Sequence, residues 1–567
     1  MLGLKLKWIV ILAFICAATV QAEPLERLVD APENRPYRLW PSRPPENCPF
    51  KPSDAIKGIA FTGRYVNYTN ADTWYPSWAA DGNYYSPWTD GSVGDDHCFS
   101  GGGEKAHTGQ AKIVGDDPMD LEITSLGTLN ASALPYGGRY PCGSLVHEGV
   151  WYYGTYGLMN ADYGLNWPIL GPCPGFHVST DYGKTWEKSP HSCKPGDALF
   201  PEPDKLGGPV KIGAPHFVDF GKNMEHSPDG KAYLVGHGST EQDEDDRRAN
   251  LSWITGDQIY MCRVKPSPEN INDESAYEYF AGHDDGGKAR WTKDFEDIQP
   301  LIDWDNHCGC VTATYNPELG RYLMCITDGW PTIKSMDTCI LESEKITGPW
   351  RLVSYMEDLG EQAYFVNFPG KFIAADGRTA WLCYAANFTD PQHNKWPAKP
   401  PGSEYAMSLH QVRLLGPDEE VTPGPLNDPR NVAREAQVSV TSTYEDYHAF
   451  GAVDGRVGGF PHDTDAEWAS AGERESAILR LRWQEPVTIE RVWLFDRPND
   501  LDQVKAGMLV FSDGSTIKTG ELPDDASKGL EVEFEPRKVK WLAFFVTEVK
   551  PDSPNIGLSE IAVFEGE

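Results

Sequence analysis

Five segments between residues 72 and 390 repeat one pattern: a polar start, an apolar strand, a glycine-bearing turn and a second, aromatic-rich strand. Strands joined by short glycine turns are typical of β-hairpins. A hairpin unit that recurs along a chain in this way indicates the blades of a β-propeller. The five segments begin at Asp72, Tyr140, Ala214, Asn306 and Glu361. Because helical periodicity is scarce, we predict an all-β fold with a five-bladed propeller.

The predicted propeller also indicates where a site would lie. The first strand of each hairpin should be innermost, so that its start faces one central funnel. The second strand returns to the same face, and its end should face the funnel as well. Residues far apart in the sequence therefore meet at one pocket, and these strand ends are the places to look for catalytic and binding groups.

The first 22 residues, MLGLKLKWIVILAFICAATVQA, combine two Lys, an apolar core and small residues ahead of Glu23. This is the pattern of a secretory signal peptide. The apolar run is shorter than the about 20 residues that a membrane span requires, which disfavours the alternative of an uncleaved anchor. We expect cleavage after Ala22 and a secreted protein, extracellular or periplasmic, without membrane insertion.

Composition divides the remaining chain into four parts. A Pro-rich arm, residues 23–53, leads into the first blade, and residues 54–415 form the predicted propeller and catalytic domain. Residues 416–427 are rich in Pro, Gly and acidic residues without apolar periodicity, as in a linker. A second pattern of alternating strands fills residues 428–567.

Acidic residues dominate the charge of the chain. It has 84 Asp and Glu against 50 Lys and Arg, a formal net charge of −34, and no basic stripe. Such a field repels nucleic acid and acidic membranes, so neither is an expected partner. It also disfavours a sulfated or uronic substrate unless a local cationic pocket exists. The same acidity is common in soluble secreted proteins. We expect a monomer or weak oligomer that acts on a carbohydrate.

Eleven cysteines follow the predicted signal peptide, all between residues 48 and 383. In an exported chain they suggest disulfides, with one thiol left over. Cys173 and Cys193 flank one loop and could close it. Cys48 and Cys98 could tie the arm to the first blade.

The block STDYGKTW, Ser179 to Trp186, matches the Asp-box pattern S-x-D-x-G-x-T-W. It resembles the repeats of sialidases and other propeller glycosidases. We predict a β-hairpin turn in which Asp181 caps the turn backbone and Trp186 packs beneath it. In those families the motif lies at the propeller rim, so its expected role is structural.

Glycoside hydrolysis needs two carboxyl groups, one that protonates the leaving oxygen and one that activates water or attacks the sugar. The predicted architecture resembles the five-bladed arabinanase and xylosidase families, the levansucrase and invertase group, and six-bladed sialidases. No motif of these families matches residue for residue. By position, the resemblance makes Asp72 the base or nucleophile and Glu361 the acid. Asp90 and Asp328, at the ends of second strands, are alternative carboxylates.

We therefore predict a secreted glycoside hydrolase that cleaves a poly- or oligosaccharide in the funnel and needs no cofactor for the reaction. Each carboxylate also has an ordinary interpretation. Asp72 could cap a turn, Glu361 could lie in an exposed loop, and Asp90 and Asp328 could belong to common turns.

Three histidines of the third and fourth repeats, His216, His237 and His307, lie at comparable depths of the predicted funnel. They could donate hydrogen bonds to sugar hydroxyls, or together they could bind zinc. Hydrogen bonding to sugar is the interpretation that we favour.

Aromatic residues supply the remaining candidates for substrate binding. Trp74, Trp330 and Tyr156 stand near the predicted funnel, where an aromatic face can stack on the C–H surface of a sugar. Core packing is the alternative for each of them. Two other functions fit the same funnel: a polysaccharide lyase that uses Tyr156, His216 and His237, and a non-catalytic glycan-binding protein.

Three motifs mark residues 428–567: Asn431-Val-Ala433, Ala-Val-Asp-Gly at 452–455 and Gly-Leu-Ser-Glu-Ile at 557–561. In order and spacing they resemble the discoidin, or coagulation factor 5/8 type C, module. The resemblance implies a jelly-roll β-sandwich, often a carbohydrate-binding accessory of secreted glycoside hydrolases. It also implies a structural Ca²⁺ held by Asp454 and Glu560, since hard oxygen ligands suit calcium. The alternative is a turn-capping Asp454 and a solvated Glu560.

Overall fold

In the computed structural model, the described residues are 25, 27–30, 43–132, 138–159, 169–192, 196–202, 209–239, 253–329, 336–386, 400, 402–417, 430–445, 447–455, 457–460, 464, 467–526 and 528–566. The chain forms two units. Residues 39–419 make the first unit described below, and residues 1–38 together with 420–567 make the second.

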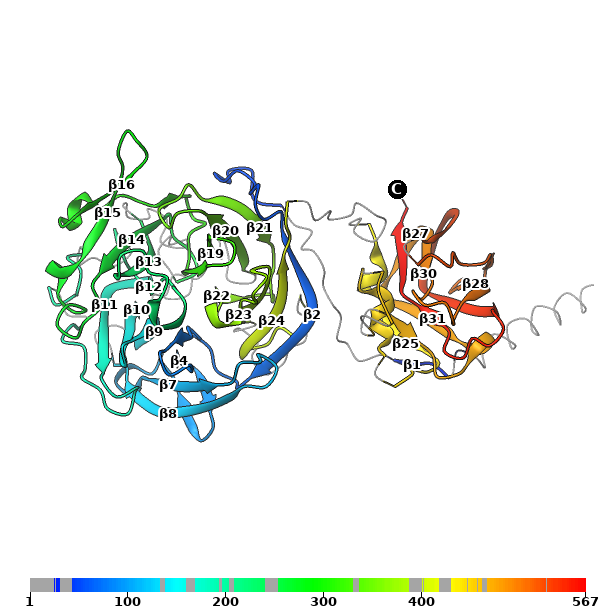
Figure 1. Cartoon of the computed structure of the whole chain (residues 1–567), viewed down its shortest axis with the longest axis horizontal. Helices are drawn as coiled ribbons and strands as arrows, with labels where there is room; N and C mark the ends of the chain where they lie inside the picture. The colour runs from blue at the N-terminus through cyan, green and yellow to red at the C-terminus, as the bar shows by residue number, and fades with distance from the viewer. Residues whose placement is uncertain are drawn as a thin grey trace, which may run out of the picture. The chain divides into compact units, whose positions relative to one another are not determined.

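Five antiparallel sheets form the blades of a propeller, placed around one axis in chain order (Figure 1). From the axis outwards, the first blade contains β3 (Ser77–Trp78), β4 (Tyr84–Trp88), β7 (His107–Val114) and β8 (Glu122–Asn130). The second contains β9 (Gly138–His147), β10 (Val150–Met159) and β11 (Ile169–Ser179). The third contains β12 (His216–Phe217), β13 (Ala232–Gly238), β14 (Gln258–Val264), β15 (Glu278–His283) and β16 (Ala289–Thr292), with β17 (Ile302–Asp303) beside β14. The fourth contains β18 (Val311–Asn316), β19 (Arg321–Asp328), β20 (Asp337–Ser343) and β21 (Arg351–Met356).

The fifth blade closes the ring with strands from both ends of the propeller. It contains β22 (Tyr364–Asn367), β23 (Thr379–Ala385), β24 (Met407–Leu414) and β2 (Ile59–Tyr68). β2 precedes the first blade in the sequence, yet it pairs antiparallel with β24, from Ile59 opposite Leu414 to Tyr68 opposite Met407. Main-chain hydrogen bonds therefore seal the ring between its first and last strands.

The prediction of five blades is confirmed, and the strand that opens each of the five repeats is the innermost strand of its blade. Packing between neighbouring blades explains the sequence pattern. β13 is buried along its whole length, and β19 along all but its first residue. Because both faces of such a strand are covered, its residues form continuous apolar runs and not an alternation of polar and apolar positions.

Short elements complete the propeller. β5 (Gly91–Val93) and β6 (Asp96–Cys98) form a small hairpin after β4. The described 3₁₀ turns of this unit are η1 (Gly103–Lys105), η2 (Lys222–Met224), η4 (Glu274–Ala276), η5 (Phe295–Asp297) and η6 (Gly370–Phe372).

The Asp-box forms the predicted turn at the end of β11. Asp181 Oδ1 accepts hydrogen bonds from the backbone nitrogens of Lys184 (3.1 Å) and Thr185 (2.9 Å). Hydrogen bonds from the Thr185 side chain and backbone lower the pKa of Asp181 to about 2. Trp186 packs against Trp151 with ring centroids 5.2 Å apart. The structural role expected for this motif is confirmed.

The predicted link between Cys48 and Cys98 is wrong. Both are free thiols. Cys98 is buried in the core of the first blade, whereas Cys48 packs against the core of the third and fourth blades. Cys173 is disulfide-bonded, and its predicted partner Cys193 lies outside the described residues. Seven further described cysteines are free and buried: Cys142, Cys262, Cys308, Cys310, Cys325, Cys339 and Cys383.

The second unit is a β-sandwich. Its main sheet has the order β1-β25-β27-β30-β28-β29, β32 also pairs with β27, and β26 pairs with β31. These strands are β1 (Val29–Asp30), β25 (Gln437–Val440), β26 (Trp468–Ala469), β27 (Ile478–Phe495), β28 (Val504–Phe511), β29 (Thr516–Thr519), β30 (Leu530–Val549), β31 (Gly557–Leu558) and β32 (Glu560–Glu565). Its 3₁₀ turns are η8 (Val432–Glu435), η9 (Ala449–Val453) and η11 (Arg474–Ser476). Bulges interrupt β27 and β30, so that the first part of β27 pairs with β25 and the last part with β32.

The N-terminal arm does not all run into the first blade, as the sequence had suggested. Val29 and Asp30 form β1, which pairs with Val440 and Ser439 at the edge of the sandwich. Asp30 Oδ1 accepts a 2.6 Å hydrogen bond from Ser439 Oγ. Asp30 also lies 3.6 Å from the guanidinium of Arg482. The unpaired edge of β25 thus takes an acidic strand from the other end of the chain.

None of the helices in the described part of the chain has the length and apolar character that crossing a bilayer demands.

Candidate functional site

The starts of the inner strands meet at the centre of the propeller, as predicted. One buried cluster there joins residues of all five blades, among them Tyr75, Cys142, Ala214, Cys310 and Tyr364. Hydroxyl-bearing rings dominate its polar groups. The centre therefore combines aromatic surface with hydrogen-bonding atoms.

Asp72 lies at this centre and is almost fully buried. Its Oδ2 accepts hydrogen bonds from the hydroxyls of Tyr364 (2.7 Å) and Tyr405 (3.1 Å), and its Oδ1 accepts one from Thr73 (2.8 Å). Burial, followed by the nearby charge of Asp90, raises the pKa of Asp72 to about 8. Burial and this neighbouring charge therefore favour the protonated form of the carboxyl group.

Asp90 is the carboxyl group whose charge raises the pKa of Asp72. The backbone of Asp72 pairs with that of Thr89, with both N–H···O distances at 3.0 Å, which sets the two acids on adjacent segments. Asp90 Oδ1 accepts a 2.6 Å hydrogen bond from the backbone nitrogen of Ser100. Burial raises the pKa of Asp90, whereas the hydrogen bond from Ser100 favours its ionised form. The one hydrogen of the Tyr405 hydroxyl is shared between Asp72 Oδ2 and the backbone carbonyl oxygen of Asp90, which lies 2.9 Å away.

Strained backbone surrounds this pair. Thr73, Asp90 and Phe365 have φ values of 65°, 44° and 55°. For a β-branched or bulky residue such a conformation is rare, and it costs about 1–3 kcal/mol. Gly91 shows why the chain tolerates the close approach, since a Cβ there would lie 2.1 Å from the Asn70 carbonyl oxygen. Strain of this kind concentrates at functional sites.

Near Asp72 lie three buried polar side chains without a hydrogen-bond partner in the described structure: Tyr75, Tyr156 and His216. The unpartnered atoms are the two hydroxyls and both ring nitrogens of His216. The rings of Tyr75 and His216 have centroids 4.3 Å apart. Burial, with a contribution from His237, lowers the pKa of His216 to about 3, so the imidazole is neutral.

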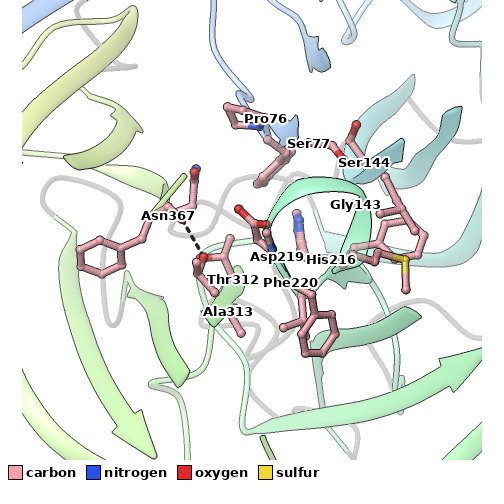
Figure 2. Close-up of a pocket in the computed structure, with 18 residues that line it drawn as sticks. Pro76, Ser77, Gly143, Ser144, His216, Asp219, Phe220, Thr312, Ala313 and Asn367 are labelled. Carbon is pink, nitrogen blue, oxygen red and sulfur yellow. Dashed lines mark hydrogen bonds between the residues drawn. The ribbon is translucent and has the colours of Figure 1, made fainter. Parts of the chain in front are cut away.

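A small cavity continues along the axis beyond this layer (Figure 2). The inner strands of all five blades line it, and Figure 2 shows His216, Asp219, Thr312 and Asn367 around it. Its volume is about 40 Å³, which holds a few water molecules and no sugar ring. Asp219 accepts hydrogen bonds from the backbone nitrogens of Gly221 (2.9 Å) and Gly370 (2.7 Å). Asp219 therefore joins the third blade to the fifth.

His307 and Asp328 form a second polar cluster on the fourth blade. His307 Nδ1 lies 2.5 Å from Asp328 Oδ2, and its ring stacks on Trp304 at 4.5 Å. The hydroxyl of Tyr355 lies 2.7 Å from Asp328 Oδ2 and 2.8 Å from Asp337 Oδ2. A phenol has one hydrogen, so both contacts are hydrogen bonds only if one carboxyl group is protonated. Burial raises the pKa of Asp337, which favours its protonated form.

The other predicted residues are placed as follows. Glu361 precedes β22 with a φ of 59°, and its backbone bonds to Asp358 and Met336. Trp74 is buried in the core of the first blade and donates to the Ala71 carbonyl oxygen at 2.8 Å, which is the packing alternative. Trp330 lies outside the described residues. His237 is fully buried on β13.

Groups of three or more metal-binding side chains are absent from the described residues, so the alternative of a three-histidine zinc site finds no support there. Instead, His307 bonds to Asp328, and His216 lies against Tyr75.

In the sandwich, Asp454 and Glu560 are both fully buried. The alternative of a solvated Glu560 is wrong. The backbone nitrogen of Gly455, next to Asp454, donates to Glu560 Oε2 at 2.9 Å, so the two acids lie at one turn. Two carboxylates without solvent are the kind of oxygen ligand that Ca²⁺ takes. Arg434 also lies against Gly455, where a Cβ would be 1.9 Å from its guanidinium nitrogen, and offers another positive charge.

Sequence reasoning missed Tyr364 and Tyr405, the two phenols that hold Asp72. The sequence does contain a signal for Tyr364, because this residue stands on the fifth inner strand, three positions after Glu361. Tyr405 lies in the segment before β24, which none of the five repeats covers. No local pattern in the sequence marks that residue.

A family model described as Domain of unknown function (DUF7402) matches residues 431–564. No curated protein matches the chain. The lectin domain of lectinolysin complexed with Lewis B antigen is 20% identical over 24% of this chain and 99% of that domain, with a TM-score of 0.20. A fucose binding module of Streptococcus pneumoniae is 14% identical over 25% of this chain and 99% of the module, with a TM-score of 0.21. The family 32 carbohydrate-binding module of C. perfringens NanJ, in complex with galactose, is 15% identical over 24% of this chain and 96% of the module, with a TM-score of 0.20.

Proposed function

We propose that the propeller binds a glycan at the face where its inner strands begin. The observation that carries the proposal is the set of buried polar atoms without a partner on Tyr75, Tyr156 and His216. A buried polar group that lacks a hydrogen bond costs about 1–3 kcal/mol. These atoms therefore need a partner that the described chain does not supply. Because the cavity beside Tyr75 and His216 holds no sugar ring, the hydroxyl groups of a sugar would reach these atoms through bridging water.

The surroundings favour a sugar over an apolar ligand. Tyr364 and Tyr405 donate to the carboxyl group of Asp72, and Tyr140 lies near enough for the charges of Asp72 and Asp90 to act on its hydroxyl. Trp253 packs edge-on against Tyr364 with centroids 5.0 Å apart. Aromatic faces that alternate with polar atoms complement the C–H faces and hydroxyl edges of a carbohydrate.

Hydrolysis of a glycosidic bond is a second candidate, and the pairing of Asp72 with Asp90 favours it. Two neighbouring carboxyl groups whose environments separate their pKa values can divide the roles of acid and base. Burial raises the pKa of both groups, and the charge of Asp90 raises the pKa of Asp72 further. Asp72 would then donate the proton to the leaving oxygen, and Asp90 would serve as base or nucleophile. This reverses the role that position alone suggested for Asp72.

The observations support a polysaccharide lyase less well than glycan binding or glycosidic hydrolysis. A lyase base has to accept a proton at neutral pH. Burial raises the pKa of Tyr156 well above its ordinary value, which holds this phenol in its protonated form. We further propose export of the protein, on the sequence pattern of its first 22 residues.

Binding is tested with the chain that begins at Glu23 and a panel of soluble xylan, arabinan, galactan and glucan oligosaccharides, by isothermal titration calorimetry. The double variant Tyr75→Phe/Tyr156→Phe should bind the preferred oligosaccharide about tenfold more weakly, since each lost hydrogen bond is worth about 0.5–1.5 kcal/mol. Asp284→Asn, in an exposed turn of the third blade, is the matched control. Failure of the wild type to bind any glycan would overturn the proposal.

Cleavage is tested separately, by release of reducing ends from the bound glycan. Asp72→Asn and Asp90→Asn should each lower turnover ~10²-fold or more while binding persists. Turnover near the wild-type rate in both variants would remove the pair from catalysis. A wild type that binds and releases no sugar would leave a binding protein.

A further inference from the structure

We infer that Phe99 is an aromatic platform for a neutral sugar unit at the mouth of this site. The inference rests on the proposed glycan binding and adds a residue and a ligand class to it. Phe99 follows β6, and its side chain is 58% exposed. Val114 and Met119, the other large apolar side chains exposed in the described propeller, are 37% and 38% exposed.

The backbone beside Phe99 is fixed to the carboxyl pair. The next residue, Ser100, donates its backbone N–H to Asp90 Oδ1 at 2.6 Å. The hydroxyl of Ser100 bonds to that of Thr89, which precedes Asp90. On the other side, the Phe99 carbonyl oxygen accepts a 3.1 Å hydrogen bond from the backbone nitrogen of His107. An exposed ring on such a segment loses little freedom when a ligand binds, because its backbone is already ordered.

Two glycines, Gly101 and Gly102, lie against the Phe99 ring. A Cβ built on Gly101 would be 3.1 Å from Phe99 Cζ and 3.4 Å from the hydroxyl of Tyr140. A Cβ built on Gly102 would be 3.4 Å from Phe99 Cδ1. The edge of the Phe99 ring and the Tyr140 hydroxyl therefore border one small space.

Tyr140 links that space to the acids. It is partly buried, and the charges of Asp90 and Asp72 both act on its hydroxyl. An exposed aromatic face thus stands next to a phenol that is itself next to the carboxyl pair. Single exposed apolar residues are common on protein surfaces. Phe99 differs from such residues in three ways: its backbone is hydrogen-bonded on both sides, two glycines lie against its ring, and Tyr140 links it to the two acids.

The chemistry of Phe99 and Asp90 determines the class of sugar that can bind here. A phenylalanine face offers apolar contact and no hydrogen bond, so it fits the C–H face of a sugar ring whose hydroxyls reach Tyr140 and Asp90. The hydrogen bond from the Ser100 backbone favours the ionised form of Asp90, and an acidic sugar beside this carboxylate would be repelled. The unit bound against Phe99 is therefore a neutral pyranose or furanose, and not a uronic acid.

The experiment compares the mature chain with Phe99→Ala, Phe99→Trp and Met119→Ala, using the panel of neutral oligosaccharides and their uronic-acid counterparts. Phe99→Ala should weaken binding of the preferred neutral oligosaccharide about tenfold, since an aromatic stacking contact is worth about 0.5–1.5 kcal/mol beyond the area that it buries. Phe99→Trp should retain binding, and Met119→Ala should match the wild type. Uronic-acid counterparts should bind at least tenfold more weakly than neutral ones.

Thermal unfolding of the variants provides the control for folding, and Phe99→Ala should unfold with the wild type because its side chain is exposed. If the wild type binds neutral glycans and Phe99→Ala binds them equally well, the platform is refuted while glycan binding stands. If binding of uronic-acid oligosaccharides equals that of neutral ones, the ligand class is refuted. If the wild type binds no glycan, the proposed function fails and the platform with it.

Discussion

Tyr364 donates a 2.7 Å hydrogen bond to Asp72, a residue that precedes it by 292 positions. The bond joins the inner strand of the last blade to the start of the first, across the seam of the ring. A donor to a carboxylate stabilises its ionised form. Tyr364 therefore opposes the burial that raises the pKa of Asp72 to about 8, and it fixes the direction in which the carboxyl group points.

Removal of this donor should change the titration of Asp72. In Tyr364→Phe the ionised form loses one hydrogen bond, so the pKa of Asp72 should move upward from its wild-type value. Carboxyl ¹³C chemical shifts followed against pH measure it. Tyr384→Phe is the control, since that phenol bonds to Ser403 at 2.7 Å in the same blade. Identical Asp72 titrations in Tyr364→Phe and the wild type would contradict the role of Tyr364.

The free energy of unfolding of the propeller should fall between about pH 4 and about pH 8. The pKa of Asp72 is about 8 in the folded protein against an ordinary 3.8, so within this window the folded state holds a proton that the unfolded chain has released. Its contribution is complete below the unfolded pKa and is lost as the pH rises through the folded one. The slope for one such group is at most about 1.4 kcal/mol per pH unit.

Asp90, with a folded pKa of about 6, adds a slope of the same sign between about pH 4 and about pH 6. Asp72→Asn cannot release a proton, so its stability should depend less on pH than that of the wild type. Urea unfolding of both proteins across this range measures the difference. Parallel curves for the two proteins would show that burial does not raise the pKa of Asp72.

Calcium should stabilise the sandwich if Asp454 and Glu560 hold the ion that the sequence resemblance implies. Binding to the folded state alone raises the unfolding temperature by mass action. The full-length protein should therefore melt higher in calcium than in chelator, and Glu560→Gln should abolish the difference. Differential scanning calorimetry resolves it. An unchanged transition would assign the compensating charge at this turn to Arg434.

The N-terminal strand should protect the edge of the sandwich. Deletion of residues 23–30 removes β1 and the contacts of Asp30 with Ser439 and Arg482. The free energy of unfolding of the sandwich should fall by about 1 kcal/mol, as for the loss of exposed cross-strand pairs and ion pairs. Hydrogen exchange of the β25 amides should become faster, whereas Asp54→Asn, at an exposed position just after the arm, should not change it. Equal protection of β25 with and without β1 would refute this prediction.

Local patterns of the sequence predicted the inner strands and the Asp-box turn well. Both depend on residues that are neighbours in the chain, such as Asp181 and Thr185 in one turn. The closure of the ring by β2 was not predicted, because residues 59–68 and 407–414 carry no mark of their pairing. Nor was β1, since a two-residue strand has no periodicity.

The candidate site was harder to predict than the fold. Asp72 was selected because it begins the first repeat, and it does lie at the centre. The position of Glu361 suggested the second carboxyl group, but the group that acts on Asp72 is Asp90. Spacing in the sequence carries no distance, and only the backbone pairing of Asp72 with Thr89 sets Asp90 there. Trp74 was predicted to stack on sugar but packs in the core of the first blade. The sequence does not separate the two roles, because large aromatic rings occur both in cores and at sugar-binding sites.

Closure of the ring by β2 has a consequence for biosynthesis. The partner of Tyr68 is Met407, so β2 leaves the ribosome long before the strand with which it pairs. At about 5–20 residues per second, roughly 20–70 seconds separate the synthesis of the two strands. During this interval β2 has unpaired N–H and C=O groups along the side that later meets β24, and such edges promote aggregation. During synthesis, residues 59–68 are therefore open to pairing with the wrong strand until β24 has been made.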